Sequence, residues 1–324
     1  MFSEDGSTLA IEANNTVDIW DPLHRIKRGA LPIDWTTGSE SHFSLSDDGK
    51  LLADLRRSGD IEIWDVASAR KKATLMTRHT IDIDTSVAFS PDDRTLALLA
   101  FQSDLTSVLE LWDTATGHLR ATSIGAHLDV PQYLLGGVWN PKILFSPDGK
   151  TVISAMDQGI VDVATGARRV APNSGLYAAR AVSRGGLVAA NVGTGQPLTF
   201  WDGRTLQQRS YIPNDAQLGD TMAFSPDGQL LAAADENGQI RLWDVTNRHP
   251  FGLPLTGPDE SLPVEALAFS ADGSAVLSID SEGRLHTHLI GPAQIETALC
   301  AQVGPLSPAN WKTYIPDLPY RRTC

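Results

Sequence analysis

Residues 224–244 read FSPDGQLLAAADENGQIRLWD and combine a tight turn with two different strand patterns. In FSPDG, proline presets φ for the first turn position, glycine supplies a positive φ, and serine and aspartate can bond the neighbouring backbone. The apolar run from Leu230 is typical of a strand buried on both faces, whereas QIRLW, from Gln239, alternates polar and apolar residues as a half-buried strand does. The segment therefore predicts a turn that joins strands.

The same two landmarks recur along the chain. Turn segments related to FSPDG begin at Phe2, Leu45, Phe89, Phe145, Val182, Phe224 and Phe269. A second landmark, Trp-Asp in five copies and diverged in two, follows at Trp20, Trp64, Trp112, Val161, Trp201, Trp243 and His288. Such self-similarity indicates a repeat architecture, in which each unit buries its apolar face against its neighbours.

This pattern resembles the WD40 repeat family, over roughly residues 2 to 290. The resemblance implies an all-β, seven-bladed β-propeller over residues 1–292, with four strands per blade, called a to d from the innermost outwards. We expect outer strands d near residues 26–31, 73–76, 119–123, 167–170, 207–212 and 251–255. Met1 and Phe2 stand where strand a of the first blade should end, so this blade is expected to lack its innermost strand. We also expect no clear strand d after residues 286–290, and a longer parent protein.

Five tryptophans recur at the period of the repeat, namely Trp20, Trp64, Trp112, Trp201 and Trp243. This recurrence predicts packing elements rather than an aromatic ligand cage. The family joins each such tryptophan to a histidine before strand a, and here only His79 stands well for this, with Trp112 as its potential partner. Apolar burial is therefore expected to supply most of the stability.

Residues 293–324 have a different character. Ile295, Leu299 and Val303 fall on one helical face, and Ser307 followed by Pro308 is a typical helix start. We expect a short C-terminal helical tail, which resembles the C-terminus of bacterial signalling ATPases of the STAND type that carry WD-repeat sensor halves. This resemblance implies an NTPase module in the same parent polypeptide.

The two cysteines, Cys300 and Cys324, both lie in this tail. A disulfide between them would close a loop worth about 3 kcal/mol in the chain-entropy model. A reducing cytoplasm would disfavour the bond. Both states stay open on the sequence.

The formal net charge of −13 comes without a dense stripe of lysine and arginine. This balance argues against nucleic acid and anionic membrane surfaces as partners. No apolar run approaches the roughly 20 residues that span a bilayer, and the N-terminus has no signal-peptide pattern. The sequence predicts a cytoplasmic protein.

The sequence contains neither a G-x-S-x-G motif nor a G-x-x-x-x-G-K-[ST] loop, so we expect no catalytic residue and no cofactor. His286 and His288 share a strand face, but two ligands are too few for a usual zinc site, and no metal is expected. The alternative is a propeller-type enzyme with a small-molecule or metal site in the central channel.

Candidate partner-binding residues are aromatics that lie off the repeat period. They are Trp35, Tyr133, Trp139 and Tyr177, on connections between strand d and the next strand a, together with Arg180 as a charged contact. Aromatic and arginine side chains of this kind are typical of interface hot spots. They could equally fill gaps in the packing. The resulting hypothesis is a non-catalytic protein–protein interaction platform, the sensor or scaffold of a larger bacterial signalling protein.

Overall fold

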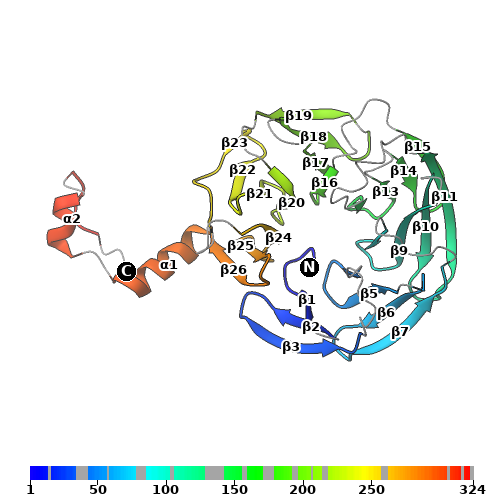
Figure 1. Ribbon diagram of the computed structural model, residues 1–324. Coiled ribbons are helices and arrows are strands. Elements are labelled where there is room, and N and C mark those ends of the chain that lie inside the picture. The colour runs from blue at the N-terminus through cyan, green and yellow to red at the C-terminus, as the bar shows by residue number, and fades with distance from the viewer. Residues whose placement is uncertain are drawn as a thin grey trace.

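The protein forms a ring of seven antiparallel β-sheets with a helical tail, as the computed structural model shows (Figure 1). The structure describes residues 1–13, 16–33, 43–56, 58–77, 85–102, 106–127, 142–154, 159–170, 179–191, 196–205, 207–213, 218–256, 262–304, 307–314 and 317–321. Each sheet is one blade, and the strands of a blade follow one another in chain order from the centre outwards. The all-β, seven-bladed prediction is confirmed.

The strands of the first three blades are short, and each blade begins with the strand nearest the axis. Blade 1 contains β1 (Leu9–Ala13), β2 (Thr16–Asp21) and β3 (Ile26–Leu31). Blade 2 contains β4 (Phe43–Leu45), β5 (Leu51–Leu55), β6 (Ile61–Asp65) and β7 (Arg70–Leu75). Blade 3 contains β8 (Ser86–Phe89), β9 (Thr95–Phe101), β10 (Thr106–Asp113) and β11 (Leu119–His127).

The other four blades repeat this order. Blade 4 contains β12 (Ile143–Phe145), β13 (Thr151–Ser154), β14 (Gly159–Asp162) and β15 (Arg168–Val170). Blade 5 contains β16 (Ala179–Val182), β17 (Leu187–Ala190), β18 (Leu198–Asp202) and β19 (Gln208–Ile212). Blade 6 contains β20 (Leu218–Phe224), β21 (Leu230–Asp235), β22 (Ile240–Asp244) and β23 (His249–Pro250). Blade 7 contains β24 (Val264–Phe269), β25 (Ala275–Asp280) and β26 (Leu285–Leu289).

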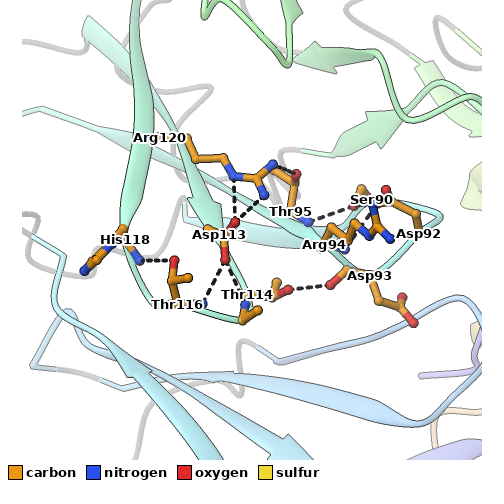
Figure 2. A network of polar contacts seen from close by, with 11 residues as sticks. Ser90, Asp92, Asp93, Arg94, Thr95, Asp113, Thr114, Thr116, His118 and Arg120 are labelled. Carbon is orange, nitrogen blue, oxygen red and sulfur yellow. Dashed lines mark hydrogen bonds and ion pairs between the residues drawn. The ribbon is translucent and has the colours of Figure 1, made fainter.

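The turn between strands a and b is closed by a serine and an aspartate that bond the local backbone. In blade 6, Ser225 Oγ accepts the N–H of Leu230 at 2.9 Å and donates to Asp227 Oδ1 at 2.6 Å. Ser90 and Asp92 make the same pair of contacts in blade 3, at 2.9 and 2.7 Å (Figure 2). These bonds satisfy backbone groups that the turn takes out of the ladder.

The aspartate of each Trp-Asp closes the turn between strands c and d. Asp113 accepts the N–H of Thr116 at 2.8 Å and pairs with the guanidinium of Arg120, which also donates to Thr95 Oγ1 (Figure 2). Hydrogen bonds to this carboxylate keep its pKa well below the usual range. The Asp of the motif is therefore a turn residue.

The core lies between the blades. Six clusters of buried apolar side chains each join two consecutive blades, from blades 1 and 2 through to blades 6 and 7. Phe200 and Phe224, in blades 5 and 6, pack with ring centroids 6.4 Å apart. Because these clusters cover both faces of the sheets of blades 2 to 6, stability in this fold is carried largely by nearest-neighbour interfaces.

The first and last blades each have three strands. Blade 1 lacks a strand a, as expected, and only an isolated bridge between Phe2 and Leu9 stands in its place. Blade 7 ends with β26, and α1 (Pro292–Val303) begins three residues later. The first turn contacts the blades on both sides of it: the N–H of Asp5 donates to Asp47 O of blade 2 at 3.1 Å, and Gly6 lies against the backbone of Phe269 in blade 7.

The outer strand of blade 6 differs from its expected range, 251–255. Regular pairing covers only β23, and a single bridge joins Ile240 to Leu255. Pro250 and Pro254 have no N–H to donate, so they interrupt the ladder. The N–H of Phe251 still donates to Leu242 O at 2.8 Å, after which the chain leaves the sheet, and Leu253 is 85% exposed.

The tail projects away from the ring as two helices, α1 and α2 (Pro308–Tyr314) (Figure 1). Within the tail, Trp311 packs edge-on against Tyr320 with ring centroids 5.9 Å apart and donates from its indole to Leu318 O at 2.9 Å. Ile295 and Leu299, on the expected apolar face of α1, are 37% and 51% exposed. Among the described residues, this face of α1 is not part of the propeller core.

Candidate binding site in the central channel

The innermost strands enclose a cavity of about 700 Å³ at the centre of the ring. Its wall comes from the N-terminal residues and from strands a and the following turns of blades 2 to 6. Apolar side chains such as Leu144, Val182 and Met222 form part of this wall, and charged side chains from several blades complete it. Volume and lining of this kind are typical of small-ligand sites.

One position of the turn between strands a and b differs in charge from blade to blade. The residue after the turn serine is proline in three blades, at Pro91, Pro147 and Pro226. It is Glu4 in blade 1, Asp47 in blade 2 and Arg184 in blade 5, and all three line the cavity. In these three blades, a charged residue therefore stands at this end of the channel where other blades have proline.

The two acids at this position carry perturbed protonation equilibria. Desolvation, reinforced by the charge of Asp47, raises the pKa of Glu4 to about 7, although the side chain is reached by solvent within the channel. Desolvation and the charge of Asp5 also raise the pKa of Asp47, and Arg184 offsets both shifts only in part. Each carboxylate is thus held in a site that favours its neutral form.

A third carboxyl, that of Asp93, strengthens the negative field beside these turns. Asp93 occupies the turn position that is usually glycine and has a φ of 58°. Its backbone oxygen accepts from Thr114, while its Oδ1 is buried and has no hydrogen-bond partner in the part of the chain that the structure describes (Figure 2). Desolvation and the charges of Asp48 and Asp47 raise the pKa of Asp93 to about 6.

Arg180, predicted to contact a partner, lies on β16 and lines the cavity. Its Nε donates to Asp220 Oδ1 at 2.7 Å, which links blade 5 to blade 6. Lys142 Nζ donates to the backbone oxygen of Asp220 at 3.2 Å, and burial lowers the pKa of this lysine to about 8. The guanidinium of Arg180 is therefore already paired, and its role toward a partner stays a prediction.

The other predicted partner residues lie outside the described part of the chain. These are Trp35, Tyr133, Trp139 and Tyr177, and His79 lies outside it as well. Cys300, in α1, is not a free thiol, but Cys324 is also outside the described residues, so their pairing stays a prediction.

The repeated tryptophans lie on strands c. Trp64, Trp112, Trp201 and Trp243 are at most 8% exposed, and Trp20 is half-buried. The indole of Trp112 donates to Glu110 at 3.1 Å and that of Trp201 to Thr199 at 3.0 Å.

His286 and His288 bind neighbours within blade 7. His286 lies 2.9 Å from Asp280 Oδ2, and His288 lies 3.4 Å from Ser278 Oγ. No group of three or more potential ligands gathers for a metal ion within the described ranges. Over the same ranges, no helix is long and apolar enough to cross a membrane.

The charged turn position was not among the sequence-predicted site residues. A signal for it existed, because aligning the seven turns shows that Glu4, Asp47 and Arg184 replace proline. That these three residues face one cavity depends on the closure of the ring, which the turns alone do not define.

Comparisons with known proteins agree with the repeat pattern. The WD40 family model, described as WD domain, G-beta repeat, matches residues 220–244. WD repeat-containing protein SL1-17 of Schistosoma mansoni is 29% identical over 173 residues, which cover 48% of this chain and 50% of that protein.

Longer matches reach a larger protein. Apoptotic protease-activating factor 1 is 23% identical over 305 residues in Rattus norvegicus and 24% over 293 residues in Mus musculus. Each match covers 86% of this chain and 22% of the relative, so the chain spans about a fifth of these relatives. Among solved structures, hydrazine synthase of Kuenenia stuttgartiensis matches with a TM-score of 0.63 at 15% identity, over 89% of this chain and 94% of that chain. At this identity the likeness concerns the fold alone.

Proposed function

The chain is a WD-repeat β-propeller, and on that premise we propose that it is a non-catalytic platform for protein–protein interaction. The observation that carries the proposal is a ring in which apolar clusters join consecutive blades around a central cavity. A scaffold of this kind presents binding residues in fixed positions, which lowers the ordering cost of association.

The relatives favour a role in signalling. The larger relative is named as a protease-activating factor, and the region similar to this chain is about a fifth of it. We propose that this propeller is likewise the sensor or scaffold part of a larger cytoplasmic signalling protein of bacterial type, with an NTPase module in the same polypeptide. Fold likeness alone does not identify the partner.

Partner capture by the purified propeller tests the proposal. Wild-type protein, the double variant Tyr133→Ala/Trp139→Ala and the control Tyr211→Ala are immobilised and exposed to extract of the source cells. Tyr211 is a suitable control because it is an aromatic on the outer strand β19 that is 56% exposed. We expect one protein to be retained in near-equimolar amount by wild type and Tyr211→Ala and lost from the double variant.

Thermal melting is measured on the same three proteins. A large fall in melting temperature for the double variant would show that the two aromatics fill gaps in the packing. Equal retention by all three proteins would contradict a partner site on these loops. A stoichiometric metal ion in the purified protein would favour the enzymatic alternative.

A further inference from the structure

Three charged side chains face the channel without touching one another. Glu4, Asp47 and Arg184 line the same cavity, and Arg184 is close enough to lower the pKa of both acids. Nevertheless, none of the three side chains makes a hydrogen bond or an ion pair with any other residue that the structure describes. Opposite charges therefore line one cavity from different blades and are not paired with each other.

The other charged residues of the cavity are already engaged. Asp5 accepts from Ser3 Oγ at 2.7 Å, and Asp48 accepts from Ser46 Oγ at 3.0 Å and from Lys50 Nζ at 2.6 Å. Arg180 is paired with Asp220. The amino group of Met1, which also lines the cavity, donates to Ala10 O at 2.8 Å. Among the described residues of the cavity, the charged groups left for a ligand are thus two carboxylates on blades 1 and 2 and one guanidinium on blade 5.

We propose that this end of the channel binds a small zwitterionic ligand of the amino-acid or short-peptide class. The ligand's ammonium group contacts Glu4 and Asp47, and its carboxylate contacts Arg184. A ligand with both groups satisfies both walls at once, and charge-assisted hydrogen bonds of this kind are the strong ones. The cavity of about 700 Å³ admits such a molecule, since small-ligand pockets are roughly 300–1,000 Å³.

Glu4, Asp47 and Arg184 are not among the residues substituted in the partner-capture experiment, so either proposal can fail without the other. In a sensor protein this site would give a small molecule access to the centre of the ring. Blades 1 and 2 lie across the channel from blade 5 (Figure 1). A bound ligand would bridge the two sides and restrict their relative motion.

Calorimetric titration of the full chain with three related probes tests the charge requirement. Triglycine carries both charged ends, triglycinamide only the ammonium, and N-acetyltriglycine only the carboxylate. At a pH of about 8 and low salt, where Glu4 is ionised, we expect triglycine to bind about tenfold more tightly than either blocked probe. Glycine serves as a fourth probe, and tighter binding of glycine than of triglycine would identify a free amino acid as the ligand class.

Variants assign each end of the ligand. Glu4→Gln/Asp47→Asn should weaken triglycine and triglycinamide about tenfold and leave N-acetyltriglycine unchanged. Arg184→Gln should weaken triglycine and N-acetyltriglycine and leave triglycinamide no weaker. The matched control, Glu236→Gln/Glu296→Gln, removes the same total charge at exposed positions on blade 6 and α1.

The different losses of affinity for the probes distinguish a defined binding site from misfolding and from diffuse electrostatic attraction. Misfolding would weaken all probes together, so the opposite selectivities of the two channel variants cannot arise from it. Equal losses in the control variant would show diffuse attraction to an acidic protein. Equal affinity for triglycine and both blocked probes, or no detectable binding of any of the four probes to wild type, would overturn the proposal.

Discussion

Proline occupies the residue after the turn serine in three blades, and charged residues occupy it in three others. In blades 1 and 2 the turn is still closed by serine, aspartate and the following positive-φ glycine, and in blade 5 Ser183 and Gly186 close a turn that has no aspartate. The residue after the turn serine is not needed to close the turn, so its identity can vary between blades. In three blades this position carries Glu4, Asp47 or Arg184, which line the channel. Within one short turn, the serine stabilises the backbone and the next side chain is the one proposed to bind a ligand.

The glycine of the first turn is constrained by its neighbour as well as by its φ. A Cβ on Gly6 would lie 2.0 Å from the backbone oxygen of Phe269, at the seam between blades 7 and 1. Gly186 has a similar φ of +81°, but a Cβ there would meet nothing within 4 Å. We expect Gly186→Ala to cost about 1 kcal/mol and Gly6→Ala to cost about 1–3 kcal/mol more.

Chemical denaturation of both variants measures this difference. Equal destabilisation by the two substitutions would show that only the backbone conformation matters at Gly6, and that the seam can adjust to a methyl group.

Glu4 makes the stability of the ring dependent on pH. Its pKa is raised from 4.5 to about 7 in the folded protein. Below pH 4.5 the carboxyl is neutral in both states, so it has no effect. As pH rises through this window only the unfolded state ionises freely, and above about 7 the folded state bears the full cost of the charge. Glu4→Gln should therefore raise the melting temperature near pH 8 and have little effect near pH 4.5.

Melting curves over this pH range check the prediction, with exposed Glu236→Gln as the control. A constant difference between Glu4→Gln and wild type at every pH would contradict it.

At the scale of the element, the hairpin between strands a and b depends on one serine, which is buried in six of the seven blades. Ser225 is 5% exposed and accepts the N–H of Leu230 while donating to Asp227. Replacing it leaves a backbone N–H and a carboxylate without this partner, so Ser225→Ala should cost about 1–3 kcal/mol. Ser58→Ala, at an exposed serine, should cost less than about 0.5 kcal/mol.

The comparison of the two serine variants by thermal melting tests the role of the turn. If Ser225→Ala has the same melting temperature as wild type, then the proline and glycine of FSPDG suffice to close the turn.

At the scale of the whole molecule, the ring is least continuous where its two ends meet. Innermost strands contact one another from β4 and β8 through to β20 and β24, but blade 1 has no such strand. Blade 7 ends at β26, which pairs on one side with β25. Local opening begins where few contacts hold an element, so the seam is expected to open before the other interfaces.

Hydrogen exchange measures this directly. Amides of β26 should exchange faster than those of β22, the corresponding strand of blade 6, which is paired on both sides. The amides of β10, which is paired with β9 and β11, should be among the slowest to exchange. Equal protection of β26 and β22 would show that the seam is as stable as the rest of the ring.

The strand order was predictable from the sequence because its causes are local. Turn residues and strand patterns repeat with the blade, and the outer strand of blade 1 agrees with its expected range, 26–31. The outer strand of blade 6 was predicted less well, since the pattern gave no weight to Pro250 and Pro254. The residues predicted for partner binding are not tested by the described structure, apart from the placement of Arg180.

The sequence by itself determined the repeat, the number of blades and the incomplete first blade, because each depends on short-range turn chemistry and on apolar periodicity. The closed ring decided which residues meet. Glu4 and Arg184 are far apart in the chain, and only the circular arrangement of the blades brings them to one cavity. The same closure presses Gly6 against Phe269, and it desolvates Glu4 and brings the charge of Asp47 close to it. Contacts and electrostatic fields of this kind act through space, so the order of residues along the chain does not contain them.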